Sequence, residues 1–292
     1  MSMKKISIAH FQKNILQWYK LYGRHDLPWR PPSLKLRRDG TLDPYKVLIS
    51  EVMLQQTQVD RVREKFISFI TKFPTLQVLA VSSTQDLLVE WKGLGYNRRA
   101  LNLRACAQKI IKDHGGVVPQ DLEALKKLPG FGPYTASAVM AFAFDKPVVV
   151  LDTNIRRIFI HFFFADQEKI HDNQLTGLIE KSIWKKSPRI WYGALMDYGS
   201  GAFKKISNPN AKSAHYVKQS KFEGSPRYVR AKILAQILEY GPHKNSQIKS
   251  FMKTDPHLLH YQKNKLLQEI LNGLEADGFL QYTNNEWRVV NN

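Results

Sequence analysis

The sequence predicts a mainly α-helical domain, followed by a small module of helices and two strands. From about residue 6 to residue 200, apolar residues recur at helical spacing and strand-like alternation is scarce. The helical segments are separated by Gly and Pro signals at 114–119, 128–133 and 186–189. Near the end, FLQYTNNEWRVV alternates and turns at Asn284-Asn285, a pattern typical of a β-hairpin.

These changes in pattern divide the chain into three expected parts. Residues 1–201 form the helical domain. Residues 202–226 form a basic linker, because eight Lys or Arg face a single acid, Glu223, across 202–232. Residues 227–292 form a winged-helix-like module, with two helices before the hairpin. The apolar positions that mark these two helices are Val229, Ile233 and Ile237, and then Leu267, Ile270, Leu271 and Leu274.

Composition bounds the class of protein and its partners. Forty-four Lys and Arg against 25 Asp and Glu leave a net charge of +19, which favours a polyanionic partner such as nucleic acid or an acidic membrane surface. A single cysteine, Cys106, excludes an internal disulfide, a zinc site with several thiolates and a Cys-ligated iron–sulfur cluster. Neither a signal-peptide core nor a run of about 20 apolar residues is present, which predicts an intracellular, soluble protein.

The octet LPGFGPYT, at 128–135, lies between two helical segments and holds two glycines one residue apart. Backbone amides in such a turn can approach a phosphate closely, helped by the positive end of the following helix. An ordinary turn between two helices, closed by a glycine cap, has the same pattern. The net charge of +19 favours the DNA-binding interpretation.

Two acids follow or interrupt apolar stretches. Asp43 and Pro44 predict the start of a helix, and Glu51 lies on the apolar stripe of that helix. A carboxyl group in such surroundings is expected to have a raised pKa and to be protonated near neutral pH. Asp152 follows the apolar run 148–151 and precedes a helical stretch, which predicts a helix cap.

Five stretches form a recognisable set: LPWR (27–30), DPYKVLISEVMLQQTQV (43–59), WKGLGYNRRALNL (91–103), LPGFGPYT (128–135) and ALMDYG (194–199). Together they resemble the MutY-type adenine DNA glycosylases of the helix-hairpin-helix (HhH-GPD) superfamily. The resemblance covers roughly residues 20–200, and SEVMLQQTQV is its most specific part. It implies an HhH-GPD fold, in which two helical subdomains lie around a cleft.

The resemblance implies roles for three residues. Glu51 would be the general acid that protonates the base, and Asp152 the carboxylate that stabilises the oxocarbenium-like sugar and assists the attacking water. Asp152 would then be both helix cap and catalyst. Tyr134 precedes the hairpin Thr135, where glycosylases that also cleave the backbone carry a Schiff-base lysine. The chain is therefore expected to be monofunctional and to leave an abasic site.

Residues for base flipping are implied in the same way. Gln55 and Gln56 of LQQT, with Leu94 and Tyr96 of GLGY, match wedge and void-filling positions. The LPWR stretch matches residues near the base pocket. The expected DNA- and base-binding residues are Trp29, Arg30, Gln55, Gln56, Thr57, Leu94, Gly95, Tyr96, Gly130, Gly132 and Thr135.

The sequence departs from the resembled family at three points. The four cysteines that hold an iron–sulfur cluster shortly after ALMDYG are missing, so the cluster is expected to be absent. The basic segment 202–232 is expected to take over its structural and phosphate-binding work. Gly193 stands where many relatives place a Gln or Glu that hydrogen-bonds adenine. The residues after about 225 resemble a winged helix, and not the larger recognition domain of members that search for 8-oxoguanine.

These features predict a monofunctional DNA glycosylase of base excision repair, which removes adenine opposite G or 8-oxoguanine after flipping it. Two alternatives stay open. One is a thymine or uracil glycosylase for mismatches with G, and the other is a non-catalytic DNA-binding protein. The expected partner is double-stranded DNA with a mismatch or an oxidised base. The protein is expected to be a cytoplasmic monomer, associated with the nucleoid in a bacterium, without metal, cofactor or membrane.

Overall fold

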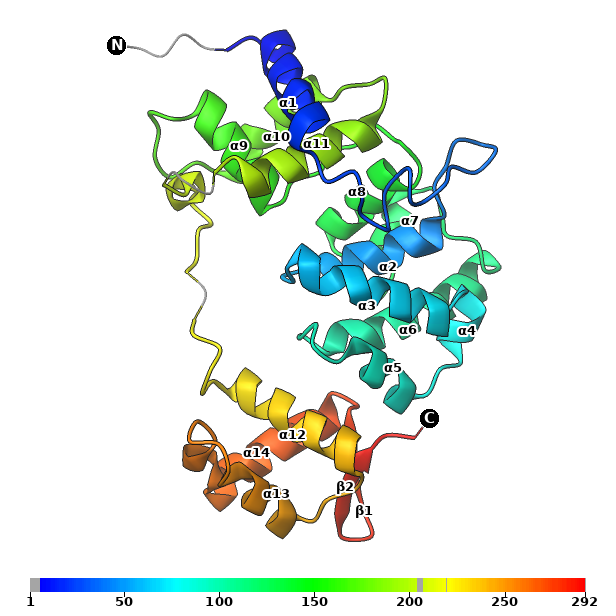
Figure 1. Cartoon of the computed structure of the whole chain (residues 1–292), viewed down its shortest axis with the longest axis vertical. Coiled ribbons are helices and arrows are strands. Elements are labelled where there is room, and N and C mark those ends of the chain that lie inside the picture. The colour runs from blue at the N-terminus through cyan, green and yellow to red at the C-terminus, as the bar shows by residue number, and fades with distance from the viewer. Residues whose placement is uncertain (1–5, 204–206, 219, 292) are drawn as a thin grey trace. The chain divides into compact units, whose positions relative to one another are not determined.

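The computed structural model describes residues 6–203, 207–218 and 220–291, and it is mainly helical (Figure 1). Its contacts group the chain into two compact units, each built from two separate stretches. The first unit combines Met1–Gln55 with Lys109–Val217, and the second combines Gln56–Gln108 with Lys218–Asn292. The boundaries expected at residues 201 and 226 stay predictions.

The first unit contains seven α-helices and one 3-10 helix among its described residues. They are α1 (Ile8–Tyr22), α2 (Pro44–Leu54), α7 (Leu122–Lys126), α8 (Pro133–Phe142), α9 (Thr153–Phe163), α10 (Asp172–Ser182), α11 (Pro188–Gly201) and η1 (Pro209–Lys212). Side-chain oxygens cap the starts of several, as predicted for Asp43 before α2 and for Asp152 before α9. These caps fix where the helices that carry the two acids begin.

Aromatic packing holds α1, α9 and α11 together (Figure 1). The Phe11 ring of α1 is fully buried and makes edge contacts with four other rings. They belong to Phe159, Phe162, Phe163 and Trp191. The α9 and α11 helices approach so closely that a Cβ at Gly199 would lie 2.6 Å from the Asn154 carbonyl oxygen. Only glycine fits there, and the crossing places the start of α9 against α11.

The LPGFGPYT stretch forms the predicted turn between two helices. The α7 helix ends at Lys126, and α8 begins at Pro133 with Gly132 as its N-cap. Gly130 has a φ of 79°, a left-handed conformation that favours glycine. The two helices pack against each other. The turn therefore presents the amino end of α8, the helix that carries Tyr134 in its first turn.

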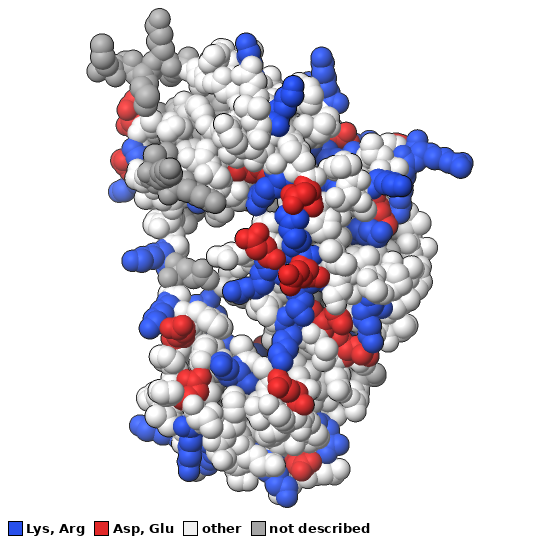
Figure 2. Space-filling model, viewed as in Figure 1, with Lys and Arg blue, Asp and Glu red and all other residues white. Residues whose placement is uncertain are grey.

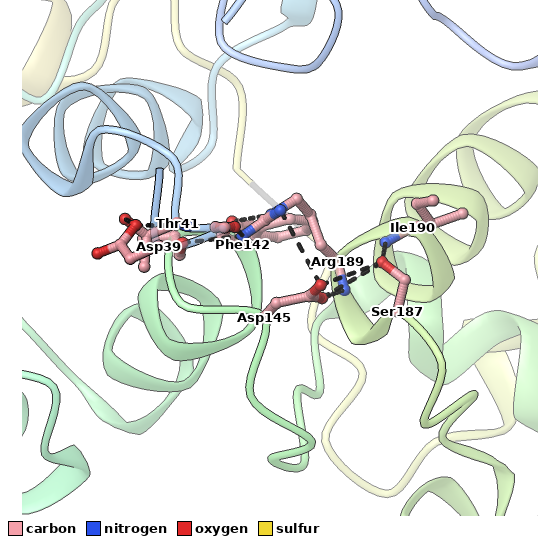
Figure 3. A network of polar contacts seen from close by, with 9 residues as sticks. Asp39, Thr41, Phe142, Asp145, Ser187, Arg189 and Ile190 are labelled. Carbon is pink, nitrogen blue, oxygen red and sulfur yellow. Dashed lines mark hydrogen bonds and ion pairs between the residues drawn. The ribbon is translucent and has the colours of Figure 1, made fainter. Parts of the chain in front are cut away.

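A buried arginine joins the end of α8 to the start of α11 (Figure 3). The Arg189 side chain donates to the carbonyl of Phe142 at 2.5 Å, and to those of Ala143 at 2.9 Å and Gly40 at 3.3 Å. Its backbone amide donates to Asp145 at 2.7 Å. The Ala143 carbonyl also accepts from the Leu42 amide, just before α2 begins. This network therefore fixes α2, α8 and α11 relative to one another.

The second unit contains the remaining elements. They are α3 (Val59–Lys72), α4 (Leu76–Ala80), α5 (Thr84–Trp91), α6 (Arg98–His114, whose last turns belong to the first unit), α12 (Pro226–Tyr240), α13 (Asn245–Met252), η2 (Leu259–Gln262), α14 (Asn264–Ala276), β1 (Leu280–Thr283) and β2 (Glu286–Val289). The C-terminal residues therefore pack with the stretch 56–108. No helix among the residues that the structure describes is long and apolar enough to span a bilayer.

The predicted C-terminal hairpin is confirmed. The β1 and β2 strands pair antiparallel, with Leu280 opposite Val289. Asn284 and Asn285 form the turn with φ values of 52° and 64°, as a two-residue hairpin turn requires. Trp287 on β2 is buried and packs the hairpin onto the helices of this module. Helices followed by a small hairpin agree with the winged-helix-like arrangement predicted for this module.

Replacing Arg189 by alanine should lower the free energy of unfolding by roughly 2–4 kcal/mol, because buried carbonyl groups lose their donors. Equilibrium urea denaturation measures this change. Lys186→Ala, which truncates an exposed basic residue nearby, is the matched control and should change stability by less than about 0.5 kcal/mol. Equal stabilities of the two variants would contradict the role given to this network.

Candidate active site

Glu51 lies in the middle of α2, among side chains that are almost completely buried. Val47, Leu48 and Ile49 are each 1% exposed or less, and Glu51 itself is 6% exposed. The pKa of this carboxyl group is raised from its ordinary value of 4.5 to about 7, mainly by burial and to a smaller extent by the nearby charge of Asp152. The charge of Arg30 and a hydrogen bond act in the opposite direction. The raised pKa predicted for Glu51 is therefore confirmed.

Tyr134, in the first turn of α8, supplies that hydrogen bond. Its hydroxyl group donates to Oε2 of Glu51 at 3.3 Å. Burial raises the pKa of Tyr134 well above 10, and the charges of Glu51 and Asp152 add to the effect. The phenol is therefore a neutral donor. Next to it, the Gln55 side-chain amide donates to Oγ1 of Thr135 at 3.0 Å, which ties the end of α2 to the start of α8.

Asp152 is the N-cap of α9, as the sequence predicts. Its Oδ1 accepts from the Ile155 amide at 2.7 Å, and its Oδ2 accepts from the Asn154 side chain at 2.9 Å. Burial raises the pKa of Asp152 above its ordinary value, and these donors and the charge of Arg156 limit the rise. The electrostatic effect of Asp152 on both Glu51 and Tyr134 shows that the three groups lie together. Two acids 101 residues apart in sequence thus share one site.

A third acid, Asp197 on α11, is missed by the sequence interpretation. It is 2% exposed, and both of its oxygens are bound by arginines. Arg24 donates to Asp197 from its backbone amide at 2.7 Å, from Nε at 2.8 Å and from Nη2 at 2.5 Å, while Arg30 Nη1 donates at 2.9 Å. Burial raises the pKa of Asp197, but the two guanidinium charges prevail and lower it. The available signal was that Asp197 is the single acid in α11.

Gly193 lies on α11 beside the same arginine. A Cβ built on Gly193 would lie 3.5 Å from the Tyr19 hydroxyl oxygen and 3.9 Å from the Arg30 guanidinium. Burial raises the pKa of Tyr19, which keeps its hydroxyl group neutral. Polar groups of Tyr19 and Arg30 therefore surround the position for which the family resemblance implies a Gln or Glu side chain. Trp29, which precedes Arg30, is buried in the core of this unit.

Thr57, Leu94, Gly95 and Tyr96 lie in the second unit. Thr57 Oγ1 donates to the Leu94 carbonyl at 3.1 Å. The Arg99 Nη2 atom donates to Thr57 Oγ1 at 3.0 Å and to the carbonyls of Leu94 at 3.0 Å and Gly95 at 2.9 Å. Leu94 is only 3% exposed, whereas Tyr96 is 41% exposed. Of the two residues proposed as wedges or void-fillers in GLGY, Tyr96 is thus the accessible one. The sequence interpretation did not identify Arg99.

Gln56, at the start of the second unit, has a φ of 53°, a conformation that is uncommon for a side chain of its type. The chain thus turns sharply between Gln55, which belongs to the first unit, and Thr57. Gly130, Gly132 and Thr135 lie at the α7–α8 turn in the first unit, with the candidate catalytic residues. The expected residues therefore form two groups, one in each unit.

A set of cysteines for an iron–sulfur cluster does not fit this chain. Its single cysteine, Cys106, is buried in α6, where burial raises the pKa of the thiol to about 12. Within the described ranges, no group of three or more His, Cys, Asp or Glu could hold a metal ion. The resemblance to cluster-bearing relatives therefore does not extend to the metal.

The segment 207–216 instead contacts the start of α9 and the loop that follows it. The Asn210 side chain is buried and donates to the Thr153 carbonyl at 2.9 Å, next to Asp152. Ile170 donates to the Lys212 carbonyl and accepts from the Ala214 amide, both at 2.9 Å. It stays a prediction that the basic segment 202–232 replaces the structural and phosphate-binding roles of an iron–sulfur cluster. Lys204 and Lys205, which belong to the basic linker, lie outside the described residues.

The chain is similar to known DNA repair proteins. The profile of the family described as HhH-GPD superfamily base excision DNA repair protein matches residues 49–186. An adenine DNA glycosylase of Mycobacterium tuberculosis is 46% identical over 145 residues, which are 50% of this chain and 45% of that protein. The human adenine DNA glycosylase is 35% identical over 201 residues, which are 66% of this chain and 36% of that protein. The chain thus spans less than half the length of these relatives.

Solved structures share the fold. A thermostable thymine-DNA glycosylase aligns with a TM-score of 0.58 and 29% identity, covering 66% of this chain and 86% of that one. A non-covalent endonuclease III–DNA complex aligns with a TM-score of 0.55 and 22% identity, covering 69% of this chain and 90% of that one. At that identity, the second similarity bears on the fold alone.

The α7 and α8 helices, joined by the glycine turn, form a helix-hairpin-helix within a mainly helical fold. Residues 49–186 match the model of the HhH-GPD superfamily of base excision DNA repair proteins. This agrees with the family resemblance that the sequence motifs carry.

The stability of the protein should fall as the pH rises from about 4.5 to 7, through Glu51. The unfolded chain loses this proton near pH 4.5, while the folded protein keeps it until about pH 7, so the charged form is disfavoured by folding. Glu51→Gln should therefore gain stability over the natural protein as the pH rises, by on the order of 3 kcal/mol at pH 8. Urea denaturation at several pH values tests this, with Glu64→Gln, at an exposed acid, as the control.

Proposed function

We propose that the protein is a monofunctional DNA glycosylase that removes adenine mispaired with G or 8-oxoguanine. The observation that carries the proposal is the pKa of about 7 at Glu51, beside a second carboxylate. A carboxyl group that is half protonated at neutral pH can give its proton to a leaving base. Such a pair of acids, with different surroundings, suits cleavage of a glycosidic bond.

The proposed reaction uses Glu51 and Asp152 as its two acids. After the nucleotide is flipped, Glu51 donates its proton to a ring nitrogen of adenine and the bond from N9 to C1′ breaks. The electron pair of that bond leaves with the base, and the sugar develops positive charge. Asp152 stabilises this charge in its ionised form, which the Ile155 amide and the Asn154 side chain favour. Water adds to C1′ and loses a proton to a carboxylate, which leaves an abasic site.

The choice of adenine rests on the relatives and on the matched motifs. Adenine DNA glycosylases of Mycobacterium tuberculosis and human are 46% and 35% identical to this chain, over 145 and 201 residues. A thymine or uracil glycosylase acting opposite G is the second candidate. It is favoured by the similarity to a thymine-DNA glycosylase structure and by Gly193, which lacks a side chain to read adenine. A non-catalytic DNA-binding protein would have no use for a buried acid of raised pKa.

Double-stranded DNA is the proposed partner. The net charge is +19, and Lys and Arg side chains are spread over the surfaces of both units on the face shown in Figure 2. The glycine turn before α8 offers backbone amides to a phosphate. Tyr96 and Gln56 are proposed to enter the duplex at the flipped nucleotide, while Trp29 and Arg30 are proposed to lie near the base. Binding of this kind weakens steeply with salt because phosphate contacts release counterions.

Glu51→Gln should abolish excision while leaving duplex binding intact. The loss of a general acid is worth about 10²–10⁴-fold in rate. In the natural protein, the single-turnover rate should fall about tenfold per pH unit above pH 7, because Glu51 then loses its proton. Glu64→Gln, with the same change at an exposed site, should keep both the rate and the pH profile. Full activity of Glu51→Gln would remove Glu51 from the mechanism.

Strand cleavage should require alkali. Single-turnover reactions on duplexes that carry A or T opposite G and 8-oxoguanine identify the excised base, and gels run with and without mild alkali reveal abasic sites. Tyr134 offers no amine for a Schiff base, so breaks should appear only after alkali treatment. Breaks without alkali would contradict monofunctional action, and excision of T in preference to A would favour the second candidate.

A further inference from the structure

The C-terminal module, residues 226–289, contacts the loop between α5 and α6 at several points within the second unit. Lys92 Nζ lies 2.8 Å from Glu239 Oε2 of α12. Tyr96 accepts a hydrogen bond at its hydroxyl oxygen from Arg227 Nη1 of α12, at 3.0 Å. Just past the loop, the Arg98 guanidinium lies 2.8 Å from a carboxylate oxygen of Asp277, which follows α14.

The three contacts are made by residues 92, 96 and 98, which lie within a short stretch of chain. Their partners belong to α12 and to the end of α14. Arg230 of α12 pairs with the same carboxylate of Asp277, which ties the two helices of the module together behind the loop. The α12 helix also packs against α5. The module therefore contacts the loop at Lys92 and Tyr96 and the start of α6 at Arg98.

The loop adopts a backbone conformation that local sequence alone would not hold. Gly93 and Gly95 have φ values of 95° and 73°, and Tyr96 has a φ of 46°, which is unfavourable for an aromatic residue. From inside the unit, Arg99 binds the carbonyl groups of the loop and lies 5.7 Å from the centre of the Tyr96 ring. From outside, Arg227 binds the Tyr96 hydroxyl group. Arg99 thus lies over the Tyr96 ring and Arg227 binds its hydroxyl group, while the residue stays 41% exposed.

From these contacts we infer that the C-terminal module serves to position Tyr96 for insertion into DNA, with Arg227 as the positioning residue. The inference rests on the proposed function, because it assumes that the α5–α6 loop enters the duplex. Its partner is the base stack beside a flipped nucleotide, which an aromatic ring can fill by stacking. A ring that is already held in place loses less conformational entropy on insertion than a free one.

Direct binding of DNA by α14 is a second possible role of the module, but the charges of the described side chains on α14 support it less well. The exposed residues of α14 include two acids, Glu269 and Glu275, against one base, Lys265. Acids facing the phosphates would oppose binding. The Lys265→Ala variant therefore serves both as a matched control for charge loss and as a test of this use.

The experiment compares Arg227→Ala, Tyr96→Phe, their double variant and Lys265→Ala in the full chain. The first readout is amide hydrogen exchange of residues 92–97 in the DNA-free protein. The second is the fluorescence of a 2-aminopurine placed beside the target adenine in a mismatched duplex, and the third is the single-turnover rate at saturating enzyme. Arg227→Ala and Tyr96→Phe should each speed up exchange in the loop and lower the fluorescence rise and the rate by about tenfold. Their double variant should lose no more than either single one, since both remove the same contact.

Three results would overturn the inference. One is unchanged exchange and fluorescence in Arg227→Ala, and another is losses that simply add in the double variant. The third is weaker binding with a reduced salt slope at an unchanged saturated rate, which marks a phosphate contact. A loss of DNA binding in Lys265→Ala equal to that in Arg227→Ala would indicate that the module binds DNA through α14. If the natural protein excises no base, the proposed function fails by itself, while exchange and 2-aminopurine fluorescence still decide how the module acts on the loop.

Discussion

The site depends on keeping one carboxyl group, that of Glu51, buried on an apolar helix without a full counter-charge. A guanidinium close to a buried acid would normally pair with it and lower its pKa. Arg30 is that guanidinium, but its Nη1 atom is bound to Asp197. Asp197 in turn is shared with Arg24, so the two arginines have a carboxylate of their own. The Arg30 charge opposes the rise in the Glu51 pKa without cancelling it. The ion-paired cluster on α11 is therefore what allows Glu51 to keep a proton.

Asp152 has the opposite requirement, and the fold meets it with a helix start. The amide of Ile155 and the side chain of Asn154 bind its two oxygens, and the amino end of α9 favours a negative charge. Two contacts hold that helix start in position. Gly199 allows α11 to approach Asn154 closely, and the Asn210 side chain donates to the carbonyl of the preceding residue, Thr153. The short segment after α11 thus helps to order the carboxylate.

The local parts of this arrangement could be predicted from the sequence, and the long-range parts could not. The cap at Asp43, the burial of Glu51 and the turn at Asn284 each follow from a few neighbouring residues. The pairing of Asp197 with Arg24 spans 173 residues, and no periodicity reports it. Similarly, the packing of residues 56–108 with the C-terminal module depends on surfaces formed only after folding. Arg99 shows the same limit, because a basic residue on a helix is normally read as solvent-exposed, yet this one is buried.

The candidate catalytic residues lie in the first unit, whereas Tyr96, which is proposed to enter the duplex, lies in the second. Tyr134 donates to Glu51, and the Ile155 amide donates to Asp152, within the first unit. Arg99 donates to Thr57, and Arg227 donates to Tyr96, within the second unit. The geometry of each group therefore follows from its own unit. A substitution that loosens the α5–α6 loop leaves the pKa of Glu51 unchanged, since the groups that set this pKa all belong to the first unit. Effects on the pH profile and effects on insertion into DNA can for this reason be assigned to different parts of the chain.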